Sequence, residues 1–139
     1  MKNESTKNPT HSEVFRRPFS LDSYYCYIWC NEGRQMCFSV LFDWENEEEK
    51  KKLEKIVALL NGEDDVPFKH VGYNFDEDLI GVGDTVEEAG KPILLTRGWG
   101  YLTGCGALAL DRKVARDIQI DFMKWVISKL CGKPQDVIF

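Results

Sequence analysis

The chain of 139 residues contains no apolar run of the roughly 18 residues that a membrane-spanning helix needs. Its polar N-terminal segment, residues 1–13, has no hydrophobic stretch of the kind found in secretory signals. Lys and Arg total 18 against 23 Asp and Glu, so the chain lacks the basic excess on which general nucleic-acid binding depends. These absences predict a cytoplasmic protein that binds neither membranes nor nucleic acids.

The chain has only two histidines. It has five cysteines, but no two of them have the C-x₂-C spacing that is common in metal sites. An odd cysteine count without a signal peptide favours reduced thiols. In the hairpin register described below, Cys26, Cys30 and Cys37 share one face, which leaves a metal site as an alternative. His70 is a partner for a nucleophilic cysteine only if the fold brings the two together. We favour buried thiols and a structural His70, and we assign no metal and no cofactor.

The segment Tyr24–Phe42 predicts a β-hairpin, because both halves are rich in aromatic and β-branched residues and flank a turn sequence at 31–34. With Glu32–Gly33 as a two-residue loop, Cys30 pairs with Gln35. This register places an entirely apolar set on the expected core face: Tyr25, Tyr27, Trp29, Met36, Phe38, Val40 and Phe42. The opposite face carries the three hairpin cysteines and is not polar enough for water. We therefore expect a helix or a partner to cover it.

Two longer segments have the period of amphipathic helices. The first, Asn46–Asn61, begins with a capping asparagine and has Glu49 in the capping-box position. The second, Asp111–Cys131, begins with a capping aspartate and carries a wide apolar arc, as expected for a helix that crosses a sheet. Gly132 follows it and marks its end.

Short strands are expected at 68–74, at 78–82 and at Ile93–Arg97. The resulting order, ββαβββα, predicts an α+β fold with a mostly antiparallel sheet of about five strands packed with two helices. We expect one globular domain over residues 13–139 and a flexible N-terminal tail over residues 1–12.

The segment 97–106 holds four glycines and lies between the last predicted strand and the second helix, the position of a phosphate-binding loop. Its spacing is one residue longer than G-x-G-x-x-G, and no G-K-[ST] follows. We therefore favour an architectural bend, with a ligand site as the alternative. Four residues in it are candidates for ligand or partner binding: Arg97, Trp99, Tyr101 and Thr103.

Residues 63–88 carry nine acidic side chains and one lysine. Five residues of this segment have the spacing of a calcium loop, namely Asp76, Asp78, Gly81, Asp84 and Glu87. Ile80, however, stands where a calcium loop needs an oxygen ligand. We interpret the segment as a solvated surface, with a basic partner as the alternative.

The residues do not assemble into a catalytic set, and no motif indicates a known family. We therefore expect a small, cytoplasmic, non-catalytic binding protein that engages a protein partner, or a second copy of itself, through Tyr24–Phe42 or the acidic segment 63–88. The alternative is a binder or enzyme for a small or phosphate-bearing ligand that uses segment 97–106. A polar pocket lined by the four candidate residues would favour the alternative, and an apolar patch on the hairpin would favour the partner.

Overall fold

The computed structural model describes residues 8–41, 45–103, 108–132 and 137–138 of the chain. In these ranges seven strands form one sheet in the order β1-β2-β3-β6-β5-β4-β7. Neighbouring strands are antiparallel, except that β7 runs parallel to β4. The α+β class is confirmed, and two short edge strands, β1 (Ser20–Leu21) and β7 (Val137–Ile138), raise the strand number above the prediction.

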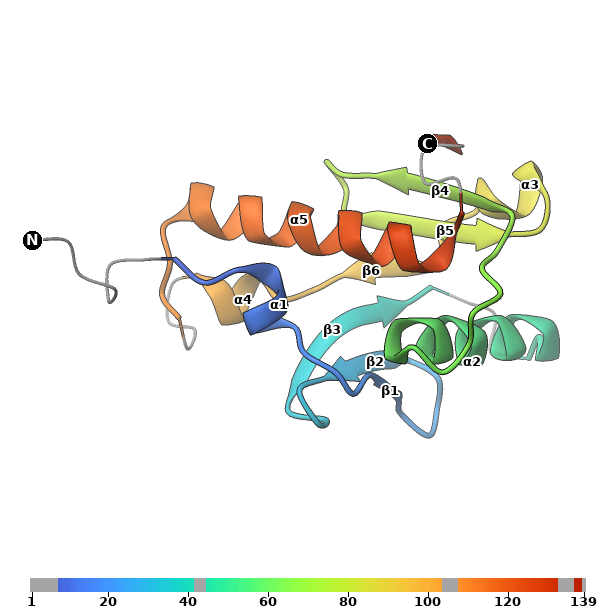
Figure 1. Ribbon diagram of the computed structural model, residues 1–139, viewed down its shortest axis with the longest axis horizontal. Helices are drawn as coiled ribbons and strands as arrows, with labels where there is room; N and C mark the ends of the chain where they lie inside the picture. The colour runs from blue at the N-terminus through green and yellow to red at the C-terminus, as the bar shows by residue number, and fades with distance from the viewer. Residues whose placement is uncertain (1–7, 42–44, 104–107, 133–136, 139) are drawn as a thin grey trace, which may run out of the picture.

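The central strands and the two long helices follow the predicted order. The strands are β2 (Tyr27–Cys30), β3 (Gln35–Val40), β4 (His70–Asn74), β5 (Leu79–Gly83) and β6 (Leu94–Thr96). Helices α2 (Glu47–Asn61) and α5 (Arg112–Leu130) contact each other and lie side by side across the sheet in Figure 1. In the described part of the chain no helix is long and apolar enough to span a membrane.

The predicted hairpin register is correct at the turn but wrong beyond it. Cys30 pairs with Gln35 as expected, but Ile28 pairs with Phe38 because a β-bulge adds one residue to β3. On β2 the predicted faces are therefore exchanged, so that Ile28 and Cys30 are fully buried while Tyr27 is 38% exposed. The hairpin face with the three cysteines was expected to be covered by a helix or by a partner, and in the structure helices cover it. Of the predicted core set, Phe42 lies outside the described residues.

The core is centred on Phe122 of α5. Its ring stacks on Phe15 at 4.2 Å between centroids and on Phe38 of β3 at 5.5 Å. Phe15 follows the short helix α1 (His11–Val14), so the N-terminal segment packs against the long helix. Residues 1–7 of the expected tail lie outside the described ranges, whereas His11 and Ser12 belong to α1.

A short helix, α3 (Val86–Ala89), lies against the other face of the sheet. Ile80 and Val82 of β5 are buried in the core, so the glycine between them faces away from α5. A β-carbon on Gly81 would come within 2.6 Å of the Ala89 carbonyl oxygen. The absence of a side chain at position 81 therefore allows the end of α3 to rest on the strand.

Candidate functional site

Strand β6 lies at the centre of the sheet, and a cavity opens near each of its two ends. The cavity near its start, about 320 Å³, lies between the first turns of α2 and the segment around α3. The cavity beyond its end, about 410 Å³, is lined by residues of β3, β6 and α5 and by the short helix α4 (Trp99–Leu102). We call the second one the β6-end cavity.

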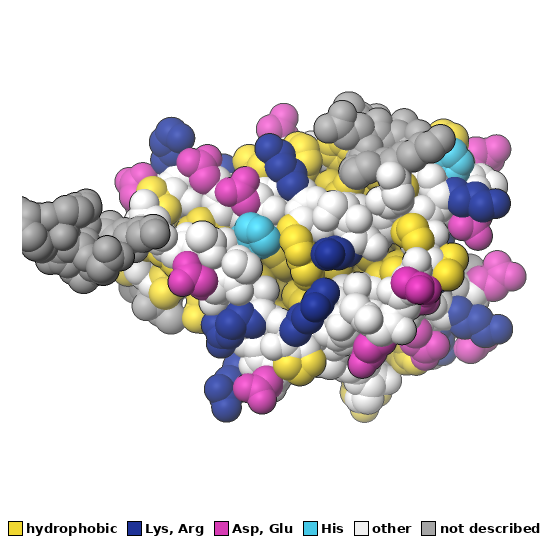
Figure 2. Space-filling model, viewed as in Figure 1, with side chains coloured by type: hydrophobic (Ala, Val, Ile, Leu, Met, Phe, Trp, Pro, Cys, Tyr) yellow, Lys and Arg dark blue, Asp and Glu magenta, His cyan; other side chains and the backbone are white. Residues whose placement is uncertain are grey.

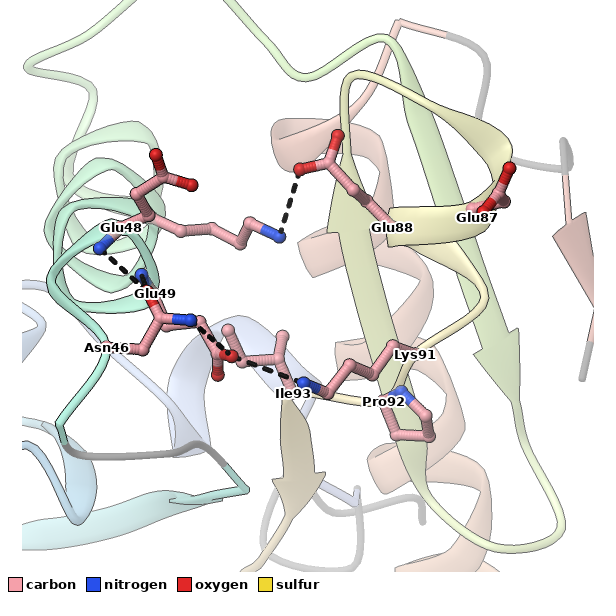
Figure 3. Close-up of a pocket in the computed structure, with 9 residues that line it drawn as sticks. Asn46, Glu48, Glu49, Glu87, Glu88, Lys91, Pro92 and Ile93 are labelled. Carbon is pink, nitrogen blue, oxygen red and sulfur yellow. Dashed lines mark hydrogen bonds and ion pairs between the residues drawn. The ribbon is translucent and has the colours of Figure 1, made fainter.

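Charged side chains pair with one another around the cavity near the start of β6 (Figure 3). Lys91 contacts Glu49 at 3.2 Å, and Lys52 lies 3.8 Å from Glu88. Asn46 caps α2 by accepting hydrogen bonds from two backbone N–H groups of the first turn. The α2 N-terminus, Glu49 and Glu88 thus already have partners within the protein, and these contacts do not point to a ligand.

On the face seen in Figure 2, acidic side chains do not gather in one place. Figure 2 shows acidic and basic side chains interspersed with hydrophobic ones on the face that carries α1, α2 and α5. The acids of the turn 76–78 lie just before β5, and those of residues 84–88 lie just after its other end. The acidic segment is therefore divided, and its sequence does not correspond to a single charged patch.

The β6-end cavity brings together three of the four residues singled out from the sequence. Arg97, Trp99 and Tyr101 all line it. Thr103 does not, because its side chain turns back and its hydroxyl donates to the Trp99 carbonyl at 2.8 Å. Arg97 is exposed, and its guanidinium makes a long hydrogen bond of 3.4 Å to the Ser39 hydroxyl.

Gly98 makes the bend that shapes this cavity. Its φ of +130° is a conformation that residues with a side chain rarely adopt. The bend ends β6 and starts α4, which places Trp99 beside the cavity with 38% of its surface exposed. Helix α4 has only four residues, so it offers little dipole for a phosphate. Residues 104–107, which include the remaining two glycines of the stretch, lie outside the described residues.

Two residues that line the cavity each have a buried side-chain oxygen with no hydrogen-bond partner among the described residues: Thr96 Oγ1 and Gln119 Oε1. Thr96 and Gln119 are only 3% and 2% exposed. Leaving such a group unsatisfied costs about 1–3 kcal/mol. Gln119 is not among the candidate residues named from the sequence, although a polar residue four positions from both Ala115 and Met123 on the buried helix face is a signal that a sequence carries.

An ion pair borders the cavity on the side of β5. Arg116 Nη1 donates to Asp78 Oδ1 at 2.6 Å, and the second guanidinium nitrogen donates to the Phe75 carbonyl. The Asp78 carbonyl accepts a hydrogen bond from the Thr96 backbone N–H at 2.8 Å, which fixes Asp78 beside the end of β6. The Arg112 guanidinium, from the start of α5, lies 5.9 Å from the centre of the Trp99 ring.

The cysteines of the hairpin do not form the three-ligand set that the predicted register allowed. Cys30 and Cys37 are fully buried, whereas Cys26 is exposed. Burial and the neighbouring Cys30 thiol raise the pKa of Cys37 well above its ordinary value, which makes it a poor nucleophile. No cluster of three potential metal ligands exists among the described residues.

The calcium loop considered from the sequence is contradicted by the strand that runs through it. Asp76 and Asp78 belong to the turn before β5, whereas Asp84 follows that strand at its other end. Strand β5 keeps these carboxylates apart, so they cannot share one ion. His70 begins β4, is half-buried and pairs with Gly83.

The outer face of the sheet, opposite α5, carries one uncharged row across four strands. Cross-strand pairing aligns Tyr27, Ser39, Leu95 and Leu79. All four are at least partly exposed, and none of them carries a charge. We call this set the outer row.

Comparison of the chain with protein-family models, with curated proteins and with solved structures finds no match.

Proposed function

We propose that this chain is a small-ligand-binding protein whose site is the β6-end cavity. The observation that supports this function most directly is the pair of buried atoms without partners, Thr96 Oγ1 and Gln119 Oε1. A ligand toward which the Thr96 and Gln119 side chains turn, and which donates hydrogen bonds to these oxygens, removes a cost of about 1–3 kcal/mol for each atom. Arg97 and Trp99 add a cation and an aromatic surface, which is the usual combination of a few polar groups with apolar walls.

The sequence left two functions open, the binding of a protein partner and the binding of a small ligand, and the cavity favours the second. The sequence favoured a protein partner, because no assembled site could be recognised in it. A polar pocket lined by the four candidate residues is what favours the ligand-binding alternative. Three of the four, Arg97, Trp99 and Tyr101, line the β6-end cavity. Gln119, which lies more than a dozen residues further along the chain, supplies the buried acceptor that the segment 97–106 itself does not contain.

Native mass spectrometry of the protein purified from cells tests the ligand directly. We expect a retained small-molecule mass on the unmodified chain and none on the Gln119→Leu variant. The same variant should unfold with a free energy about 1 kcal/mol higher, because it removes an unsatisfied polar atom while keeping the buried volume. Thr96→Val is a second, isosteric test of the same effect.

In the Gln119→Leu variant, a loss of ligand together with a gain in the free energy of unfolding distinguishes a binding role of Gln119 from a structural one. A residue that serves only packing would lose stability when it is replaced, and binding would fall as a consequence. A bare mass in all samples, together with a Gln119→Leu variant that is less stable than the original chain, would contradict the ligand-binding function.

A second candidate, self-association, is favoured by the outer row alone. The row Tyr27, Ser39, Leu95 and Leu79 has no charge of its own, so it adds no like-charge repulsion between two copies of a chain of net charge −5. We infer a second copy of this chain as the occupant of that face, since a two-fold axis lets the same row meet itself.

Sedimentation velocity tests this candidate over a range of concentrations. We expect a dimer that the Leu95→Glu variant converts into a monomer. Val66→Glu is the matched control, because Val66 is 61% exposed and lies outside the sheet. A monomer at all concentrations, or equal effects of the two variants, excludes self-association through the outer row.

A further inference from the structure

A third cavity lies on the helical face of the molecule, where the segment that follows α1 packs against α5. Its volume is about 250 Å³, and it shares no lining residue with the β6-end cavity. Its lining includes the rings of Phe15, Phe19 and Trp125 and the cationic residues Arg16 and Arg17, but no acidic residue. In the middle of the face shown in Figure 2, basic side chains lie beside hydrophobic ones. The cavity therefore combines apolar walls with positive charge.

Three cations are associated with the half-buried ring of Trp125 or with the cavity that it lines. The Arg17 guanidinium lies 5.9 Å from the centre of this ring, and the Lys129 ammonium lies 6.0 Å from it. Arg16 lines the same cavity. All three side chains belong to exposed residues, so a partner can reach them from solvent. We call Arg16, Arg17 and Lys129 the cation group.

No member of the cation group has an acidic partner within the described part of the chain. Five ion pairs are found there, and they use other cations: Lys50, Lys52, Lys91, Lys113 and Arg116. Arg16 Nη1 instead donates to the Glu13 carbonyl at 2.6 Å, and the neighbouring arginine also donates to a carbonyl. Like charges without a counter-charge repel one another, so an anion bound here stabilises this surface.

Arg17 is held in a position from which it can bind a carboxylate. Its Nε donates to the Leu60 carbonyl near the end of α2 at 2.7 Å, which fixes the plane of the guanidinium. Its two terminal nitrogens lie beside the exposed Gly62, each 3.5 Å from the position that a β-carbon would take there. No hydrogen bond from these two nitrogens is found among the described residues. Such a pair of nitrogens matches the two oxygens of a carboxylate.

We propose that the cation group and this cavity dock a short acidic segment of a partner protein, which carries one large apolar side chain. A carboxylate of the segment accepts from the terminal nitrogens of Arg17, and a second one meets Lys129. The apolar side chain packs in the cavity against Trp125. This surface is separate from the β6-end cavity, so the inference does not depend on the proposed ligand.

Charge complementarity favours an acidic protein segment over two other occupants. A second copy of this chain offers no continuous acidic segment, because its acids at 76–78 and at 84–88 lie at opposite ends of β5. A nucleic acid needs many phosphate contacts to overcome the net charge of −5, and the cation group supplies three positive charges.

Three dye-labelled hexapeptides test the docking by fluorescence anisotropy with the full chain. The first is Glu-Asp-Glu-Phe-Glu-Asp, the second has Gln and Asn in place of its acids, and the third has Ala in place of Phe. We expect the first peptide to bind about tenfold or more tightly than either of the others, since it alone provides both the carboxylates and the ring. Raising NaCl from about 0.05 M to about 0.3 M should weaken it several-fold.

Variants assign the binding to the cation group. Lys129→Gln should weaken the acidic Phe peptide about threefold, and Arg17→Lys should weaken it about tenfold because it keeps the charge but loses the paired nitrogens. Lys51→Gln is the matched control, because Lys51 is an exposed cation about 14 Å from Leu60 along α2. It should leave the binding unchanged. Arg17→Lys also removes the hydrogen bond to Leu60, so the melting temperature of each variant is measured alongside.

Four results would overturn this proposal. The first is that the acidic Phe peptide does not bind, or binds no more tightly than its neutral counterpart. The second is an equal effect of Lys129→Gln and Lys51→Gln. The third is tighter binding of a labelled oligothymidylate than of the acidic peptide, which would make a nucleic acid the occupant. The fourth is a dimer in sedimentation velocity that Lys129→Gln dissociates, which would make a second copy the occupant.

Discussion

Gly98 lies directly against the ring of Phe15. A β-carbon at position 98 would come within 2.8 Å of Phe15 Cζ, closer than non-bonded carbons approach in proteins. The ring cannot withdraw easily, because it stacks on Phe122 with 4.2 Å between the centroids. The bend at Gly98, which shapes the β6-end cavity, therefore packs against the N-terminal segment and, through Phe15, against the centre of the core.

Replacing Gly98 with alanine should destabilise the fold. The added methyl group meets the Phe15 ring, and the φ of +130° disfavours any side chain. We expect a loss of about 2–4 kcal/mol in the free energy of unfolding, measured by urea denaturation.

Gly100→Ala is the matched control two residues away. A β-carbon at Gly100 has no atom within 4 Å and lies in α4, where alanine is the better helix former. This variant should be neutral or slightly more stable than the original chain. Equal losses in the two variants would show that the bend does not depend on Gly98.

The ion pair between Asp78 and Arg116 should contribute measurable coupling energy, because both side chains are largely buried, at 24% and 29% exposed. Asp78→Asn tolerates the positive φ of this position and Arg116→Gln removes the guanidinium. In a double-mutant cycle the two changes should couple by about 1 kcal/mol.

The exposed pair Lys113–Asp117 provides the control for that cycle. Its side chains are 83% and 62% exposed, although the atoms are only 3.3 Å apart. Water screens such a pair, so its coupling energy should be a few tenths of a kcal/mol at most. If the two cycles gave the same value, the Asp78–Arg116 pair would be no more than a surface contact.

The elements that the sequence predicted well are those determined by local chemistry. Helix α2 starts after Asn46, whose side chain accepts from the Glu48 and Glu49 N–H groups, and α5 starts after Asp111, which caps in the same way. A cap acts within one helical turn, so its residues can be read without knowledge of the fold.

The failures concern relationships between distant segments. The bulge in β3 reverses the faces of β2, and no glycine or other local signal near Cys37 announces it. The place of Gln119 on the apolar face of its helix can be read from the sequence, but its nearness to Thr96, which lies on another element and lines the same cavity, cannot. Burial without a hydrogen-bond partner is a property of the folded chain, and it therefore required the structure.

Cys26 should react with iodoacetamide much faster than the other cysteines of the hairpin. Its side chain is exposed, whereas Cys30 and Cys37 are fully buried and react only when the fold opens locally. The pKa of Cys37 is raised by burial and by the Cys30 thiol, which further lowers its thiolate fraction at neutral pH. Peptide mapping after a short native labelling should find Cys26 modified about 100-fold more than Cys37. Comparable labelling of the two would show that β3 is open to solvent.

His11 is positioned to make the docking of α1 dependent on pH. Its ring lies 6.5 Å from Phe122 and 6.2 Å from Trp125, between centroids. Burial lowers the pKa of His11 below its ordinary value, and the Asp121 carboxylate opposes this shift. Asp117 of α5 and the segment Arg16–Arg17 are the other charged groups that share a cavity with His11.

Because the folded state holds His11 with a lowered pKa, the unfolded chain binds its proton first as the pH falls. Stability from neutral His11 is therefore present above about pH 6.5, the ordinary pKa, and is lost as the pH falls through that value toward the folded pKa. His11→Gln should show a smaller loss of unfolding free energy between about pH 7.5 and about pH 5.5 than the original chain, by urea denaturation. Asp121→Asn should show a larger loss, since it removes the attraction that opposes burial. A reversed order of the three proteins would mean that the protonated ring is the better-bound form.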